Sequence, residues 1–264
     1  LVRIYTDWKS QMENSNNNII CGRNPVLEAL RSGREIDRLF VAHGTGGGSV
    51  TAIIAKCRAK GILIKEISPQ KLDYYCGGAN HQGVAVMFAS QEYATVDDMF
   101  ALAETRGEKP FLIICDEIED PHNLGAIIRT AEATGVHGVI IPERRSASLN
   151  ATVAKAACGA LEYVPVARVT NIANTIDALK ERGVWVFGAD MDGDDYTKTD
   201  FDTPCALVIG NEGKGIGALT AKKCDAILSL PMLGKINSLN ASVAAGILMY
   251  EVVRSRKADK QPRK

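Results

Sequence analysis

FLIICDEI, residues 111–118, is an apolar run broken only by the acidic pair Asp116 and Glu117 near its end. Such a run is typical of a strand that is buried on both faces of a parallel sheet. NLGAIIRTAEATG (123–135) follows with helical spacing and ends at Gly135, a common residue just beyond a helix. We therefore take residues 111–135 as the first strand–helix unit of a domain.

Further strands and helices alternate through the rest of the chain. The strands expected next are GVIIP (138–142), a short one within YVPVARV (163–169), WVFGAD (185–190), PCALVIG (204–210) and CDAILSLP (224–231). The expected helices are ATVAKAACGAL (151–161), IANTIDALKERG (172–183) and LNASVAAGILMYEVVRSRK (239–257). This alternation predicts an α/β fold with a mostly parallel sheet that helices cover on both faces.

A smaller unit precedes this domain. GRNPVLEALRSG (22–33) predicts a helix with Asn24 as its N-cap, Pro25 as its first residue and Gly33 at its end. IDRLFVA (36–42), VTAIIAKCRAKG (50–61), ILIKEIS (62–68) and the end of LDYYCGGANHQGVAVMFA (72–89) then predict strand, helix, strand and strand. This pattern indicates a small α/β domain.

Changes in composition divide the chain into five parts. ENSNNN (13–18) is polar and of low complexity, so the residues before the first domain are expected to be disordered. Pro110 marks the start of the second domain, after a segment that opens with a short helix. The expected boundaries are 1–17 for the leader, 18–90 for the first domain, 91–108 for a linker, 109–256 for the second domain and 257–264 for a basic tail.

The overall composition is that of a soluble globular protein, with 46% hydrophobic and 23% charged residues. Lys and Arg together equal Asp and Glu, at 31 each, so net charge alone does not suggest a polyanionic partner. No apolar run approaches the roughly 18 residues of a membrane span. The first residues also lack the apolar core of a secretory signal. We therefore expect a cytoplasmic protein without a membrane partner.

Cysteine and histidine positions give no sign of a disulfide or metal site. The seven cysteines are odd in number and form no C-x-x-C pair, which predicts reduced thiols. The four histidines are scattered and form no ligand set for a metal. The aspartates between 190 and 195 resemble a calcium loop, but its twelfth position holds Phe201 instead of Glu, so we expect a solvated turn.

Three polar segments could carry chemistry. They are DPHNLGAIIR (120–129), GNEGKGIG (210–217) and LPMLGKINSLNASVA (230–244). Each has a simpler interpretation alone: an exposed helix arginine, a plain turn, and a helix N-cap at Ser238 or Asn240. An ATP-binding loop is excluded for the second segment, because Lys214 is followed by Gly215 where that motif needs Ser or Thr. Since all three adjoin strand ends of one predicted sheet, they can converge at its carboxyl edge, where α/β proteins bind ligands.

The three segments together resemble the signature motifs of a known enzyme family. The patterns N-x-G-x-x-x-R, G-N-E-x-x-G and P-M-x-G-x-x-x-S-L-N-x-S-V-A are similar to those of the SpoU (TrmH-type) branch of the SPOUT RNA methyltransferases. GRNPVLEAL (22–30) and NHQGV (80–84) resemble the RNA-binding domain of its RlmB group, which methylates a guanosine of 23S ribosomal RNA.

The resemblance implies a fold and a methyl donor. The second domain would form a trefoil knot, which chain periodicity cannot show because threaded chains are so rare. The donor would be S-adenosylmethionine, held mostly by main-chain groups of the second and third segments. The expected cofactor-binding residues are Ile209, Gly210, Asn211, Gly215, Leu230, Met232, Ser238 and Leu239.

The resemblance also implies the catalytic residues, with ribose 2′-hydroxyls of RNA as acceptors. Arg129 corresponds to an arginine that family members use in catalysis, sometimes as the base. A guanidinium stays protonated in proteins, so we expect Arg129 to stabilise charge and position groups instead. Asn123, Ser238 and Asn240 would orient the substrate and Arg129, and Glu212 would anchor the second segment or Arg129.

The resemblance further implies that RNA binds mainly to the first domain. It also implies a homodimer that pairs through the second domain. Residues 18–90 hold nine Lys or Arg against five acids, a local excess that suits a polyanion. The expected RNA-binding residues are Arg23, Asn80, His81, Gln82, Arg144 and Arg145. Two alternatives remain: transfer RNA as the substrate, or a non-catalytic RNA-binding protein of the same fold.

Overall fold

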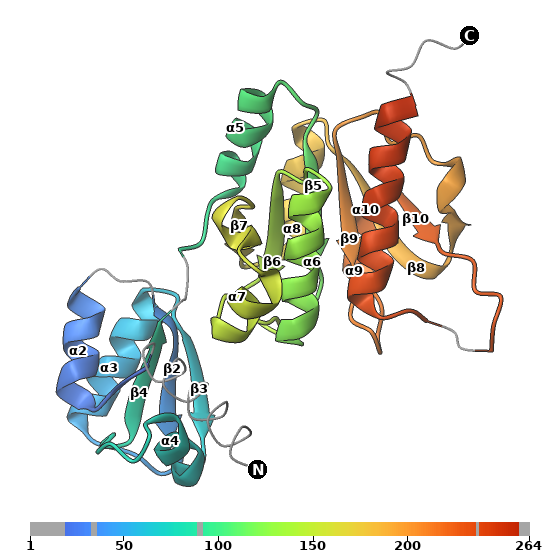
Figure 1. Ribbon diagram of the computed structural model, residues 1–264. Coiled ribbons are helices and arrows are strands. Elements are labelled where there is room, and N and C mark those ends of the chain that lie inside the picture. Colours follow the sequence, from blue (N-terminus) through green and yellow to red (C-terminus); the bar gives the residue numbers. More distant parts are fainter. Residues whose placement is uncertain (1–18, 33–35, 89–91, 236–237, 259–264) are drawn as a thin grey trace, which may run out of the picture. The chain divides into compact units, whose positions relative to one another are not determined.

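The computed structural model describes residues 19–32, 36–88, 92–235 and 238–258, and the chain divides into two compact units between Glu92 and Tyr93 (Figure 1). Each unit has its own sheet and its own buried core. The predicted leader and most of the predicted basic tail lie outside the described residues.

The first unit is built on a four-stranded mixed sheet. Its elements are β1 (Ile19–Cys21), α2 (Arg23–Arg31), β2 (Ile36–Ala42), α3 (Gly48–Ala59), β3 (Leu63–Ile67), α4 (Pro69–Tyr75) and β4 (Val84–Phe88). The strand order is β1-β4-β2-β3, in which β4 pairs antiparallel with β1 and β2 while β2 pairs parallel with β3. Leu39, Ile53 and Val86 are fully buried where α2 and α3 pack on the sheet. The predicted α/β character of this unit is confirmed.

Two helices of this unit differ from expectation. The N-cap of α2 is Gly22 with φ 98°, a backbone angle that favours glycine, so the prediction of Asn24 as the cap is wrong. Pro25 then lies within the first turn instead of at its first position, and Gly33 lies outside the described residues. The sequence pattern missed α4, although Ser68 caps it by accepting a hydrogen bond from Lys71 N and Pro69 begins it.

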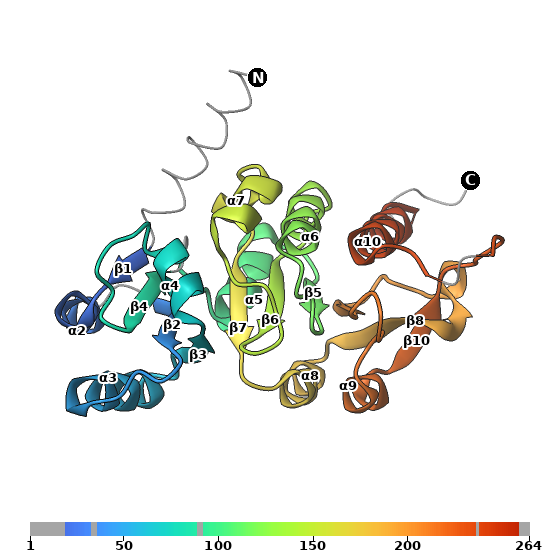
Figure 2. The ribbon, with the colours of Figure 1, turned by 90° about the horizontal axis from the view of Figure 1, so that it is seen from below.

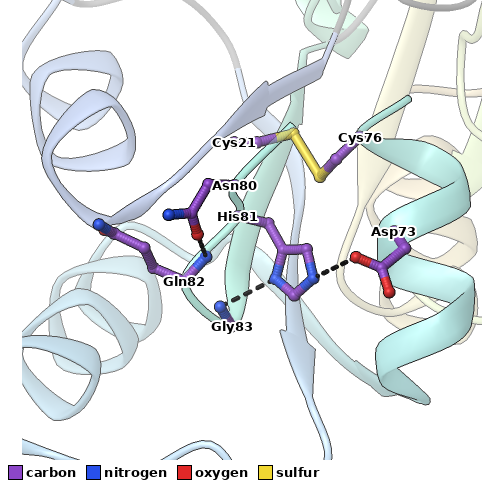
Figure 3. Close-up of a disulfide and its surroundings, with 7 residues drawn as sticks. All are labelled: Cys21, Asp73, Cys76, Asn80, His81, Gln82 and Gly83. Carbon is purple, nitrogen blue, oxygen red and sulfur yellow. Dashed lines mark hydrogen bonds and ion pairs between the residues drawn. A yellow bond between two sulfur atoms is a disulfide. The ribbon is translucent and has the colours of Figure 1, made fainter. Parts of the chain in front are cut away.

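Cys21 and Cys76 form a disulfide between β1 and the end of α4, with Cα atoms 6.1 Å apart (Figure 3). The prediction that all seven cysteines are reduced is therefore wrong for this pair. Spacing could not reveal it, because the two cysteines are 55 positions apart in sequence and only the tertiary fold brings β1 and the end of α4 together. The other five cysteines are free thiols.

The second unit holds a six-stranded sheet. Its helices are α5 (Val96–Arg106), α6 (Pro121–Ala133), α7 (Ala151–Ala157), α8 (Ile172–Glu181), α9 (Ala218–Lys223) and α10 (Ala241–Ala258), with 3₁₀ turns η1 (Ala160–Glu162) and η2 (Tyr196–Lys198). Its strands are β5 (Phe111–Cys115), β6 (Gly138–Pro142), β7 (Val166–Val169), β8 (Trp185–Asp195), β9 (Cys205–Ile209) and β10 (Ala226–Ser229). The strand order is β10-β8-β9-β5-β6-β7, and each neighbouring pair is parallel. The predicted parallel α/β domain is confirmed.

Helices cover both faces of this sheet. Figure 2 shows α6, α7 and α10 on one side and α8 and α9 on the other. One core joins Ile127, Val153 and Leu248 of the first group to the sheet, and the other joins Met99 of α5 and Ile176 of α8 to its opposite face. The five residues of β5 are all buried, as expected of a central strand.

Three segments of the second unit differ from expectation. β8 continues to Asp195 through the acidic stretch that was predicted to be a turn, because its end pairs with β10 after a register shift between Ile227 and Leu228. The short helix expected at the start of the predicted linker is observed as α5, where a capping box of Thr95 and Asp98 starts it; the difference is that its Met99 is fully buried in a core of the second unit. The short helix α9 was not predicted.

Candidate active site

A cavity of about 310 Å³ opens at the carboxyl ends of β9 and β10, beside the middle of β8. The second and third polar segments form much of its wall. All eight residues that the sequence assigned to cofactor binding line it: Ile209, Gly210, Asn211, Gly215, Leu230, Met232, Ser238 and Leu239. The convergence of these two segments at the carboxyl edge of the sheet is thus observed.

The loop after β9 folds tightly upon itself. The main chains of Asn211 and Gly215 exchange two hydrogen bonds, with N–O distances of 3.0 and 2.8 Å. A Cβ atom added to Gly210 would lie 2.3 Å from the Gly215 carbonyl carbon, so no larger residue fits there without a shift. Gly215 also has φ 68°, in the left-handed region. The glycines of this loop therefore permit a turn that presents main-chain groups to the cavity.

Three polar side chains from distant parts of the chain meet beside the cavity. Asn123 Nδ2 donates a hydrogen bond to Glu212 Oε1 at 2.8 Å, and Asn240 Nδ2 donates one to Asn123 Oδ1 at 2.9 Å. Asn240 Nδ2 also contacts Glu212 Oε1, and Ala241 N donates to the same oxygen at 3.3 Å. We call Asn123, Glu212 and Asn240 the polar triad. Since Glu212 also lines the cavity, the triad joins the first polar segment to the other two.

Asn240 additionally begins the last helix. Its Oδ1 accepts hydrogen bonds from Ser242 N at 3.0 Å and Val243 N at 3.3 Å, which is the contact of an N-cap. The predicted helix cap at Asn240 is therefore observed, and the same side chain also belongs to the polar triad. Capping fixes the direction of the Asn240 side chain, so that its amide reaches Asn123 and Glu212.

The other two predicted catalytic residues are Ser238 and Arg129. Ser238 lines the cavity. Arg129 is exposed on α6, and its Nη1 is 3.4 Å from Cys158 Sγ beyond the end of α7. Among the described residues, the cavity lining does not include Arg129. Glu212 holds Asn123 and Asn240, and so anchors its loop to the other two segments.

Several residues of the cavity wall were not identified from the sequence. They are Ala189, Asp190, Met191, Glu212, Gly213, Lys214, Leu228, Ala241 and Ala244, of which Glu212 was assigned only a catalytic role. Asp190 and Met191 belong to the part of β8 that was taken for a turn. The signal that could have found them is the adjacency of β8 to β9: Ala189 pairs with Ile209, the last residue of β9, so the residues that follow Ala189 lie beside the loop after β9.

The predicted RNA-binding residues of the first unit gather around the loop before β4. Arg23 donates its main-chain N–H to Gln82 Oε1 at 3.2 Å and its Nε to Gln82 O at 3.1 Å. His81 is held inside this loop: its Nδ1 accepts from Gly83 N at 2.9 Å and its Nε2 lies 3.0 Å from Asp73 Oδ1 (Figure 3). Asn80 and Gln82 are exposed. His81 thus shapes the loop, and the exposed amides of Asn80 and Gln82 also accept main-chain hydrogen bonds, from Gln82 N and Arg23 N respectively.

The other two predicted RNA-binding residues follow β6 in the second unit. Arg144 and Arg145 are both exposed. Arg145 Nη1 donates to Glu117 Oε1 at 2.9 Å, which raises the pKa of this guanidinium and keeps it charged. The pair follows a strand beside β5, so both arginines emerge at the carboxyl edge of the same sheet.

Within the described ranges, no group of three His, Cys, Asp or Glu side chains could hold a metal ion. None of the helices in those ranges is both long enough and apolar enough to cross a membrane. The cavity instead offers apolar side chains together with main-chain N–H and C=O groups. Such a wall suits a small ligand with a flat aromatic part and several hydrogen-bonding atoms.

Comparison with family models identifies both units. A model described as the SpoU rRNA Methylase family matches residues 110–250. A second model, described as RNA 2′-O ribose methyltransferase substrate binding, matches residues 19–94. The two matches follow one another along the chain, one in the first unit and one in the second, and leave α5 and the end of α10 outside them.

Curated relatives and solved structures agree with these models. The chain is 50% identical to a putative TrmH family tRNA/rRNA methyltransferase of Bacillus subtilis, over 90% of this chain and 95% of that protein. It is 46% identical to a protein of the same description from Staphylococcus haemolyticus, over 90% and 96%. The SpoU methyltransferase AviRb from Streptomyces viridochromogenes, crystallised with AdoMet, is similar with a TM-score of 0.58, 26% identity and coverage of 91% of this chain and 90% of its own.

Proposed function

Because the chain belongs to the SpoU rRNA methylase family, we propose that it is an S-adenosylmethionine-dependent methyltransferase that modifies a ribose 2′-hydroxyl of RNA, namely a guanosine of 23S ribosomal RNA. The observation that carries this proposal is the cavity beside the polar triad. The cavity wall contains all eight residues expected from the family motifs. Glu212, in the second polar segment, connects this wall to Asn123 of the first segment and Ala241 of the third.

The residues present fit S-adenosylmethionine. Apolar side chains of Ile209, Leu228, Leu230 and Leu239 can wall an adenine ring, and the folded loop 210–215 can offer main-chain N–H and C=O groups to it. A volume of about 310 Å³ lies at the lower end of the range of small-molecule sites. When bound, the sulfonium supplies an already activated methyl group, so the protein's main task is to place the acceptor oxygen.

We assign roles to the residues near the cavity from their chemistry. Arg129 stabilises the negative charge that develops on the ribose oxygen, or clamps a neighbouring phosphate, because a guanidinium does not act readily as a base. Asn123 and Asn240 fix the mouth of the site through Glu212. Ser238, in the cavity wall, orients the substrate.

The first unit, proposed to span residues 18–90, would bind RNA through Arg23, Asn80, His81 and Gln82. Arg144 and Arg145 of the second unit, proposed to span 109–256, would add contacts near the acceptor. We further propose the trefoil knot of the family, a cytoplasmic location, and a homodimer that pairs through the second unit. Val243, Ile247 and Tyr250 support the dimer, because these apolar residues of α10 are 49%, 37% and 55% exposed.

Transfer of a tritiated methyl group from S-adenosylmethionine tests the proposal. The whole chain would be incubated separately with 23S ribosomal RNA and transfer RNA, each from cells that lack the enzyme. We expect label in the ribosomal RNA, at a single guanosine whose 2′-O-methyl group blocks alkaline cleavage. Label only in transfer RNA would favour the first alternative, and RNA binding without any label would favour the non-catalytic one.

A further inference from the structure

Two consecutive residues at the carboxyl end of β5 hold both ends of the cavity loop, residues 210–217. Asp116 Oδ2 accepts a hydrogen bond from Gly217 N at 2.8 Å, where α9 begins. The main-chain oxygen of Glu117 accepts one from Asn211 Nδ2 at 3.1 Å, at the start of the loop. Among the described residues, the cavity wall includes neither Asp116 nor Glu117. Both therefore act on the loop, and not directly on what the cavity contains.

The sheet fixes the position of the Asp116 carboxylate. Asp116 is 7% exposed, and its N–H donates to Ile209 O at 2.8 Å, which continues the pairing of β5 with β9. A Cβ atom added to Gly217 would lie 3.2 Å from Asp116 Oδ2, so the loop approaches this carboxylate closely. A buried carboxylate needs hydrogen-bond donors, and Gly217 N supplies one.

Glu117 presents its carbonyl through an unusual backbone conformation. Its φ is 59°, in the left-handed region that residues with a Cβ atom rarely occupy unless their surroundings hold them. Its side chain is held by Arg145, whose own φ is 56°. One ion pair thus joins two residues of left-handed backbone, Glu117 after β5 and Arg145 after β6, and the Glu117 carbonyl accepts the hydrogen bond from Asn211.

The side chain of Asn211 links the Glu117 carbonyl to the main chain of the loop. Its Oδ1 accepts hydrogen bonds from Gly213 N at 2.9 Å and Lys214 N at 3.3 Å, while its main chain pairs with Gly215. Both ends of the Asn211 amide are therefore engaged, one with Glu117 and one with the loop. A change at the Glu117 carbonyl would move the main-chain groups that line the cavity.

We propose that Asp116 and Glu117 are positioning residues for the methyl donor, which they serve by holding the loop 210–217 in its binding conformation before the donor arrives. A loop that is already ordered loses less conformational freedom on binding, so affinity rises without an added contact. The inference rests on the proposed function, since it takes S-adenosylmethionine as the occupant of this cavity.

Matched variants of the whole chain separate this role from simple stability. Asp116→Ala removes the acceptor of Gly217 N, whereas Asp116→Asn keeps an oxygen there. Glu117→Val disfavours the left-handed backbone, whereas Glu117→Gly permits it. Glu119→Ala, at an exposed neighbour, is the control for any change in this segment.

Calorimetric titration with S-adenosylmethionine and steady-state kinetics give the readouts. For Asp116→Ala and Glu117→Val we expect the Kd and the KM for S-adenosylmethionine to rise about tenfold, as the loss of about one good hydrogen bond predicts. The kcat at saturating donor should stay within about twofold of the parent, since chemistry itself keeps its groups. Asp116→Asn, Glu117→Gly and Glu119→Ala should stay close to the parent in all three constants.

Thermal unfolding of each variant shows whether it folds. If Asp116→Ala does not, Gly217→Pro removes the same hydrogen bond from the donor side, because φ −56° at this residue suits proline. Gly217→Ala adds a Cβ atom but keeps the N–H, and is its control. Unchanged donor affinity in the folded Ala, Val and Pro variants would overturn the inference while leaving the proposed function intact. A parent protein that does not bind S-adenosylmethionine would overturn both.

Discussion

Asn123 Nδ2 lies 2.8 Å from Glu212 Oε1, although 89 residues separate the two in sequence. This contact ties the start of α6 to the loop after β9. Asn240 joins both from the start of α10, so a single carboxylate of the second polar segment accepts hydrogen bonds from the first and the third. The geometry of the site therefore depends on this one acceptor.

Replacing Glu212 tests that dependence. Glu212→Ala leaves the amides of Asn123 and Asn240 and the N–H of Ala241 without their acceptor, and we expect the free energy of unfolding to fall by about 1–3 kcal/mol. Glu212→Gln keeps an oxygen in place and should cost less. Urea unfolding of the two variants measures the difference. Equal losses for both would show that the shared acceptor is not what matters.

Arg129→Ala should abolish methyl transfer while leaving donor binding unchanged. Arg129 is exposed and lies outside the cavity wall, so its loss should not alter the affinity for S-adenosylmethionine. Loss of one group that stabilises a developing charge typically lowers kcat by about 10²–10³-fold. A tritiated-methyl assay and calorimetry measure the two effects, with Arg106→Ala, at another exposed arginine, as the control. Near-normal turnover in Arg129→Ala would remove this residue from the mechanism.

Acid should destabilise the second unit through His137, which is fully buried. Its Nδ1 accepts from Phe111 N at 3.0 Å, so the ring proton of the neutral form is on Nε2, which lies 3.1 Å from Glu108 Oε2. Burial lowers the pKa of His137 below its usual 6.5, against a smaller opposing effect of Glu108. As the pH falls, His137 therefore takes up a proton in the unfolded state before it does so in the folded state. The stability that the neutral, buried ring contributes is complete above about pH 6.5 and is lost as the pH falls below it.

This one group can change the free energy of unfolding by at most about 1.4 kcal/mol for each pH unit. His137→Gln removes it, although it also weakens the contact with Phe111 N. We therefore expect the variant to be less stable at every pH, with a flatter decline between pH 7 and pH 5 than the parent. Urea unfolding at several pH values gives both curves, and parallel curves would contradict the assignment.

Reduction should destabilise the first unit. The Cys21–Cys76 disulfide closes a loop with a sequence separation of 55, which by chain entropy contributes about 4 kcal/mol. We expect dithiothreitol to lower the unfolding temperature of the parent but not that of Cys21→Ser. Thiol titration of the unfolded, unreduced parent should find the five free cysteines. A count of seven would rule the bond out under those conditions.

Much of the second unit could be predicted from its sequence. Short apolar runs bounded by turn residues, such as 111–115 and 205–209, indicated buried parallel strands, and both are observed. The acidic end of β8 could not be predicted, because its strand character comes from pairing with β10 across a register shift. Periodicity reports the burial of a residue's own side chain, and these side chains are mostly exposed.

The candidate site shows the same limit. The residue types of the cavity wall follow from the motifs, but Asp190 reaches it only through the neighbouring strand. Gly125 is another example: it lies in the first motif, yet the structure gives it a packing reason, since a Cβ atom there would lie 2.4 Å from Ala156 Cβ on α7. Contacts between elements decide such positions, and a single sequence does not contain them.

The order in which the triad is synthesised has a consequence for the cell. Asn240 comes 117 residues after Asn123, and it is the side chain that begins the last helix. Protein chains fold from the N-terminus as they leave the ribosome, so β5 and α6 emerge long before the residue that completes their site. An unfinished nascent chain therefore lacks part of the cavity wall, and the proposed donor site is complete only after translation has passed the third segment.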